Sequence, residues 1–450
     1  MCQQTFALTY SIFSDILVGW LQLADVSRLD VACNNTAVRT QFLHAVASSS
    51  LIIQDPRVHQ AAGYANFLQW VGKRRIHLNN IHIPARVFDH MECHSPGPIA
   101  ANTTKRLKTL HLEQCMDICD QKFISIIKNC PYLRTLIVGS SGYKSWITDK
   151  SLEALARYCP KIQHIKIENN MFITDHGIQK VVTACLDLRK VCLLKCVKIG
   201  RSVVKSIAEN CAKLEKFSIS DNLHITTSCL ATLLEKCNEL KSLRVVRCKA
   251  ALPVDANKSS MLGLDELHYV GSPICIKHNL AAFVNRCAHL TVLYVSGVAS
   301  LSAEEIALMS HSNLRKLRSL RFDSCHHLSV TALNALLKQC PYLEEVAMHS
   351  SAVTDEIVHC IVDSCRTKLL RLDLSWCDRL SDTTITALST HCRELHCVSL
   401  KGARHITANG VHTLLDSCTK LESLNIQFCT AVIAEKLQLN TQRSSVALVM

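Results

Sequence analysis

The sequence predicts an α/β solenoid in which one short strand and one helix alternate many times and the strands form a parallel sheet. The first observation is a regular cysteine spacing: Cys159, Cys185, Cys211 and Cys237 are each 26 residues apart. The second is a phrase of alternating apolar residues after each cysteine, which predicts a strand. The third is an amphipathic stretch of about ten residues before the next cysteine, which predicts a helix. Repeats of this length are typical of solenoids, whose units pack only on their neighbours.

The strand of each unit follows the pattern L-x-x-L-x-L-x-x-C, which is complete in Leu369, Leu372, Leu374 and Cys377. Period-two alternation places one face of the strand inward. The Cys or Asn in the last slot is small, so we expect it to meet backbone groups where the chain leaves the strand.

The helix of each unit begins at a Thr or Ser that is often followed by Asp, as in Thr148-Asp149 and Ser381-Asp382. The hydroxyl is expected to cap the first helical amides, and the Asp carboxylate suits the helix dipole. About thirteen such units extend from Lys105 to roughly Gln438. One atypical unit has a lengthened loop at 250–260, with its strand at Leu267 and Tyr269. Stacked units predict a right-handed α/β horseshoe with the parallel sheet on its concave face.

This pattern resembles the cysteine-containing subclass of leucine-rich repeats, which is found mostly in F-box proteins and their relatives. The resemblance covers about three quarters of the chain. We therefore expect a short helical F-box-like segment at 1–50 and a linker or atypical first repeat at 51–104, with an early strand at 75–78. The repeats then fill 105–440, and 441–450 form a tail.

The N-terminal segment resembles a divergent F-box, because Asp15, Trp20-Leu21, Asp25-Val26 and Ala32-Cys33 match the family pattern. Phe13 stands where that pattern has its opening proline, and its late Trp is absent. The resemblance implies docking to an SCF adaptor and cullin complex. The expected adaptor-binding residues are Ile16, Leu17, Trp20, Leu21, Leu23, Val26 and Leu29. The alternative is a helical cap that covers the first repeat, since solenoid ends need covering.

Alternate strand residues are expected to point away from the core and form the concave surface. Along the middle of the central strands they carry both charge signs and some apolar groups, which suits a protein partner. Arg and Tyr are common interface anchors. The predicted substrate-binding residues are Arg244, His268, Tyr294, Arg321 and Asp373, with Asp323 at a flanking position.

The family resemblance implies a substrate-recognition subunit of an SCF-type cullin–RING ubiquitin ligase, acting in ubiquitin-dependent protein catabolism. Such a chain binds a protein substrate and performs no chemistry itself. The alternative is a non-enzymatic interaction scaffold unconnected to ubiquitin. In this alternative the N-terminal helices are only a cap, so deleting residues 1–45 is expected to lower stability or solubility but to leave partner binding intact.

Composition argues against other classes of function. The formal net charge of +13 is spread along the chain, whereas nucleic-acid binding favours a concentrated basic stripe. The 25 cysteines recur in register, so we expect core packing rather than metal sites or disulfides. The 22 histidines form no catalytic motif, and no cofactor is expected. Without a leader pattern or an apolar run of roughly 18 residues, we expect no membrane insertion and a location in the cytoplasm or nucleus.

Overall fold

The computed structural model describes residues 39–40, 43, 80–82, 104–112, 118–139, 146–254, 261–271, 279–297, 303–310, 314–325, 329–434 and 446–449. The chain divides into two compact units, Met1–His224 with Glu235–Glu239 and Ile225–Leu234 with Leu240–Met450. Both have the predicted α/β leucine-rich-repeat fold, with a parallel sheet and one helix after nearly every strand. The predicted strand at 75–78 lies outside the described residues.

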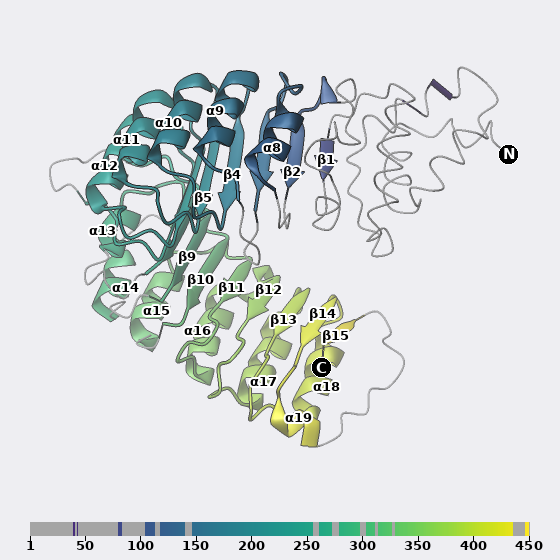
Figure 1. Cartoon of the computed structure of the whole chain (residues 1–450). Helices are drawn as coiled ribbons and strands as arrows, with labels where there is room; N and C mark the ends of the chain where they lie inside the picture. The colour runs from purple at the N-terminus through teal and green to yellow at the C-terminus, as the bar shows by residue number, and fades with distance from the viewer. Residues whose placement is uncertain are drawn as a thin grey trace. The chain divides into compact units, whose positions relative to one another are not determined.

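In the first unit, each strand pairs in parallel with the next strand along the chain. Figure 1 shows helices lining one face of these strands; the opposite face is called the open face below. The elements are β1 (Asn80–His82), β2 (Thr109–Leu112), α8 (Asp120–Ile127), β3 (Thr135–Val138), α9 (Asp149–Tyr158), β4 (His164–Glu168), α10 (Asp175–Ala184), β5 (Lys190–Leu194), α11 (Arg201–Asn210) and β6 (Lys216–Ser220).

The second unit repeats this arrangement, with consecutive strands again parallel. Its strands are β7 (Ser242–Val246), β8 (Glu266–Val270), β9 (Val292–Ser296), β10 (Ser319–Asp323), β11 (Glu345–Ala347), β12 (Arg371–Asp373), β13 (Cys397–Ser399), β14 (Ser423–Asn425) and β15 (Ala447–Val449). Its helices are α12 (Thr227–Lys236), α13 (Leu280–Val284), α14 (Ala303–Met309), α15 (Val330–Leu337), α16 (Asp355–Cys365), the 3-10 helix η1 (Arg366–Lys368), α17 (Asp382–His391), α18 (Ala408–Ser417) and α19 (Thr430–Ala434). The strand predicted at Leu267 and Tyr269 is β8.

The inward strand residues form the core between sheet and helices. In β4, Ile165 and Ile167 are buried, while His164, Lys166 and Glu168 on the other face are half-buried. This is the predicted alternation. Burying a Leu, Ile or Val side chain stabilises the fold by about 2 kcal/mol, so the repeated apolar phrase contributes to the stability of each repeat together with the apolar side chains of its helix.

The small residue in the last slot of the phrase bonds backbone groups, as predicted. The Asn170 side chain donates to the carbonyl of Ile147 at 2.9 Å and accepts from the amide of Ile173 at 2.7 Å. Where Cys takes this slot, its thiol donates to a backbone carbonyl: from Cys377 to Met348 of the preceding repeat at 3.0 Å, and from Cys325 to Asp323 of its own repeat at 3.4 Å. In many repeats the residue just before this slot has a positive φ, which turns the chain out of the strand; examples are Asn169, Lys195, Ser350, Trp376, Gly402 and Phe428.

The first-turn Asp does more than complement its own helix dipole, because it also ties its repeat to the next one. Asp355 Oδ1 accepts from the Ser381 amide at 3.1 Å and the Thr384 hydroxyl at 2.5 Å, while Oδ2 accepts from the Ser381 hydroxyl at 2.7 Å. Asp120, Asp149 and Asp382 make equivalent bonds to Thr148, Thr174 and Thr407. These inter-repeat bonds follow from stacking and were not predicted.

The cysteines of the described residues are free, and most are buried. Burial raises the pKa of the Cys211 and Cys340 thiols to about 12. Their reactive thiolate forms are therefore scarce at neutral pH. We expect iodoacetamide to label half-buried Cys119 and Cys397 in the native protein, and Cys211 and Cys340 only in denaturant. Site-resolved mass spectrometry checks this, and native labelling of Cys340 as fast as Cys397 would contradict it.

Candidate functional site

The middle row of the open face in the second unit contains the predicted substrate-binding residues. Arg244 is in register with His268, His268 with Tyr294, and Tyr294 with Arg321. These four residues thus occupy adjacent strands. Asp373 lies further along the same row, with Ala347 of β11 between it and Arg321. The structure therefore brings four of the five predicted residues together and places the fifth two strands away.

Tyr294 is the centre of this group. Its ring meets His268 edge-on, with ring centroids 5.7 Å apart. On its other side the Arg321 guanidinium carbon lies 5.1 Å from the ring centroid, in cation–π geometry. An aromatic ring held between two side chains has lost much of its freedom before any partner arrives. Such preorganisation lowers the entropy cost of binding.

Asp323 anchors Arg321, although the sequence indicated it only as a flanking surface residue. Its carboxylate Oδ2 lies 2.6 Å from Arg321 Nε, and its other oxygen accepts from the backbone amide of His349 at 3.2 Å. Asp323 is only 5% exposed. Burial acts to lower the pKa of Arg321, but Asp323 raises it above the ordinary value, with a smaller contribution from Asp373. The guanidinium is therefore a fixed cation on the open face.

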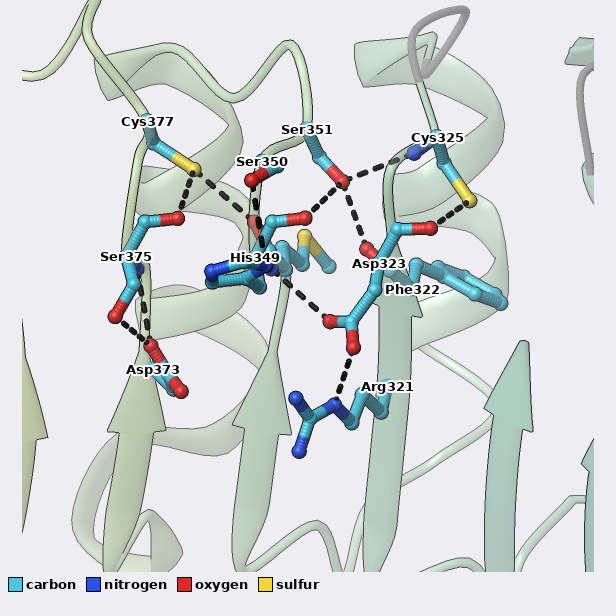
Figure 2. A network of polar contacts seen from close by, with 11 residues as sticks. Arg321, Phe322, Asp323, Cys325, His349, Ser350, Ser351, Asp373, Ser375 and Cys377 are labelled. Carbon is cyan, nitrogen blue, oxygen red and sulfur yellow. Dashed lines mark hydrogen bonds and ion pairs between the residues drawn. The ribbon is translucent and has the colours of Figure 1, made fainter. Parts of the chain in front are cut away.

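A network of polar contacts extends from Asp323 to the strand that carries Asp373 (Figure 2). The Ser351 hydroxyl donates to the Phe322 carbonyl at 2.8 Å and accepts from the Cys325 amide. Asp373 Oδ1 accepts from both the amide and the hydroxyl of Ser375. The Ser351 bonds join the repeats of β10 and β11, and the Cys377 thiol, which donates to the Met348 carbonyl, joins the repeats of β11 and β12.

Asp323, His349 and Ser350 are the residue types of a hydrolytic triad. The Ser350 hydroxyl lies 3.3 Å from His349 Nδ1, but Asp323 bonds the backbone amide of His349. A triad requires the carboxylate to orient the imidazole ring. Asp323 therefore holds the backbone of His349 and the Arg321 side chain in place, rather than orienting a base beside a nucleophile.

A second feature of this unit was missed by the sequence analysis. Trp376 and Phe428 are 45% and 57% exposed, and their rings stack with centroids 5.5 Å apart. They come from equivalent positions two repeats apart, and Lys401 lies over both rings. Gly402 lies beneath Trp376, and a Cβ there would approach Trp376 Cε3 to 2.5 Å. The sequence could have indicated this pair, because Trp376 and Phe428 occupy the same position in their repeats and Gly402 occupies that position in the repeat between them.

In the part of the chain that the structure describes, no cluster of His, Cys, Asp and Glu could hold a metal ion. Among the described helices, none combines the length and the apolar character that crossing a membrane requires. The seven predicted adaptor-binding residues, from Ile16 to Leu29, lie outside the described residues.

Comparisons with known proteins point to F-box proteins with leucine-rich repeats. A family model for the leucine-rich repeats of an FBD-associated F-box protein matches residues 256–367. The chain is also 27% identical over 115 residues to F-box/LRR-repeat protein 4 of Bos taurus. That match spans 25% of this chain and 18% of the bovine protein.

The chain is also similar to solved structures at low sequence identity. A chain from the crystal structure of the Rad7 and Elc1 complex in yeast has a TM-score of 0.55 at 14% identity, covering 95% of this chain and 98% of that one. An internalin from Listeria monocytogenes has a TM-score of 0.43 at 14% identity, covering 86% and 88% of the two chains. The yeast likeness supports the repeat fold alone.

Proposed function

We propose that this chain is a substrate-recognition subunit of an SCF-type cullin–RING ubiquitin ligase, in which it performs no chemistry itself. The observation that carries the substrate-binding part is the row Arg244, His268, Tyr294 and Arg321 on adjacent strands. A partly desolvated Tyr and a fixed Arg side by side are what protein interfaces use as anchors. The partner bound there would be a protein substrate.

The geometry of the row favours a protein over a small ligand. Tyr294 and Arg321 are half-buried on an open sheet face rather than enclosed in a cavity. Carboxylates alternate with cations, since Asp323 pairs with Arg321 and Glu345 pairs with Arg371 at 3.1 Å. Such a surface offers a partner both signs of charge around an aromatic centre, as protein interfaces do.

The adaptor-binding part rests on the N-terminal resemblance and on the comparisons. Both the matched family model and the bovine relative are described as F-box proteins with leucine-rich repeats. The yeast structure with the similar fold is a complex of two proteins. In this proposal Leu17, Trp20 and Leu21 dock the adaptor, while the repeats hold the substrate for ubiquitin transfer.

The adaptor interaction is tested by co-purification of the full chain with an SCF adaptor. Wild type is expected to retain the adaptor, and a Leu17→Ala, Trp20→Ala, Leu21→Ala triple variant is expected to lose it. A Ser14→Ala, Ser27→Ala variant of the same segment serves as the matched control and should behave as wild type. Circular dichroism checks that all three proteins are folded. Absence of adaptor from every sample would refute the proposal.

A scaffold unconnected to ubiquitin is the second candidate function. It is supported by the same open face, because a rigid row of anchors serves any protein partner. It differs in one expected result: deleting residues 1–45 would leave both partner binding and partner lifetime unchanged. The ligase subunit instead predicts unchanged partner binding with a prolonged partner lifetime.

A further inference from the structure

The open face of the first unit gathers positive charge that is dispersed in the sequence. Lys190 of β5 is in register with His164 of β4 on one side and with Lys216 of β6 on the other. Lys166 follows two residues after His164 and therefore lies on the same face of β4. His111 of β2 shares the row of Lys166 through Ile137. These five residues, His111, His164, Lys166, Lys190 and Lys216, are called the basic patch.

The groups of the basic patch are close enough to act on one another. Burial, together with smaller contributions from the positive charges of Lys190, His111, Lys216 and Lys166, lowers the pKa of His164 to about 4. His164 is consequently neutral at physiological pH. The positive charges of the neighbouring lysines contribute to this suppression, and the same charges would attract an incoming anion.

Among the described residues of this face, carboxylates are fewer than cations. Glu168 pairs with Lys166 at 3.2 Å, and Glu215 pairs with Arg189 just before the strands. The register thus places three lysines and one glutamate on the strands β4 to β6 of this face. An excess of positive charge on one sheet face favours an acidic partner, since complementary potentials steer association.

We propose that the basic patch binds an acidic protein segment in extended conformation, as an interaction surface separate from the row around Tyr294. Apolar side chains alternate with the charges, because Lys166 is in register with Ile137 on one side and Cys192 on the other. An acidic segment with interspersed apolar residues matches this alternation. From β2 to β6 the patch spans roughly 19 Å, which accommodates about six residues of extended chain.

A single-stranded nucleic acid is the competing anionic partner, and the patch suits it less well. Such binding uses aromatic side chains on which successive bases stack. The described open-face residues beside the patch are instead Thr109, Thr135, Ile137, Cys192 and Ser218. Small and aliphatic groups accept peptide side chains but provide no stacking surface.

The test is fluorescence anisotropy with the full-length chain and a labelled peptide of about twelve residues built from Glu-Val-Asp-Ser repeats. A Gln-Val-Asn-Ser peptide and an oligothymidylate of equal length are the comparison probes. At about 50 mM salt, the acidic peptide should bind more tightly than both. A Lys190→Glu, Lys216→Glu variant should weaken that binding by about tenfold or more.

The matched control is Lys150→Glu, Lys180→Glu, which makes the same change in net charge on exposed positions of α9 and α10. It should alter affinity by no more than about twofold. If the strand variant does not fold, Lys190→Gln with Lys216→Gln replaces it, with an expected loss of about threefold. Equal losses in strand and helix variants would overturn the proposal. So would equal binding of the acidic and neutral peptides, or tighter binding of the oligothymidylate. None of these outcomes bears on the row around Tyr294.

Discussion

Replacing Arg321 by Glu is expected to weaken binding of the protein substrate by about thirtyfold or more. The substitution removes the cation over the Tyr294 ring and places a second carboxylate beside buried Asp323. Both the anchor and the charge that a partner would meet are therefore lost. The measurement is quantitative mass spectrometry of proteins captured by the tagged chain, followed by dissociation constants for the most enriched protein.

Two substitutions separate this effect from general charge change. Lys338→Glu makes the same charge change at an exposed residue that ends α15 and should leave capture unchanged. Arg371→Ala removes an exposed cation of the same face, whose pairing with Glu345 is solvent-accessible, and should cost no more than about threefold. If Arg321→Glu and Lys338→Glu capture the same proteins equally well, the row around Tyr294 is not the binding site.

Replacing Asp355 by Ala is expected to lower the free energy of unfolding by about 3 kcal/mol. The substitution removes a carboxylate that accepts from Ser381 and Thr384 of the next repeat. The hydroxyl of buried Thr384 and the amide and hydroxyl of half-buried Ser381 would then lack their acceptor. Urea denaturation followed by circular dichroism measures the change. Glu356→Ala removes a neighbouring first-turn carboxylate and should cost at most about 1 kcal/mol, the value of a dipole interaction alone.

The effect of Asp355 should also depend on pH. Burial acts to raise its pKa, but hydrogen bonds from Thr384 and Ser381 outweigh this and hold the pKa below the ordinary value of 3.8. A lowered pKa in the folded state gives stability that is complete above the unfolded-state pKa and lost as pH falls through the folded-state pKa. The difference between wild type and Asp355→Ala should therefore be full at neutral pH and shrink below about pH 4. A difference that stays constant to pH 3 or so would contradict this role of the carboxylate.

The repeat fold was predictable because the apolar alternation, the cysteine and the helix-capping residue recur with the same period along the sequence. Apolar alternation located β8 at Leu267 and Tyr269 even after a lengthened loop, and the strands β2–β14 correspond to the thirteen expected units. The row from Arg244 to Arg321 followed from the same period, since residues one repeat apart meet in register on a parallel sheet.

Contacts between repeats were harder to predict from one repeat at a time. From the sequence, the first-turn Asp was expected to interact with the dipole of its own helix. Its carboxylate oxygens also accept hydrogen bonds from the next repeat. The distribution of charge along the sequence likewise did not reveal the basic patch. Lys190 and Lys216 are separated by one period of 26 residues, which brings them into register on adjacent strands. Asp323 looked exposed because strand alternation cannot show that Arg321 and His349 would cover it.

The lifetime of the captured proteins tests the proposed ligase role most directly. In cells lacking the chain, proteins whose capture depends on Arg321 are followed by pulse-chase labelling after return of wild type, of Arg321→Glu, or of the Leu17, Trp20, Leu21 triple alanine variant. We expect only wild type to shorten their half-life, because degradation needs both the substrate row and the adaptor-binding segment. Equal shortening by the triple variant would contradict the ligase role and leave the scaffold as the function.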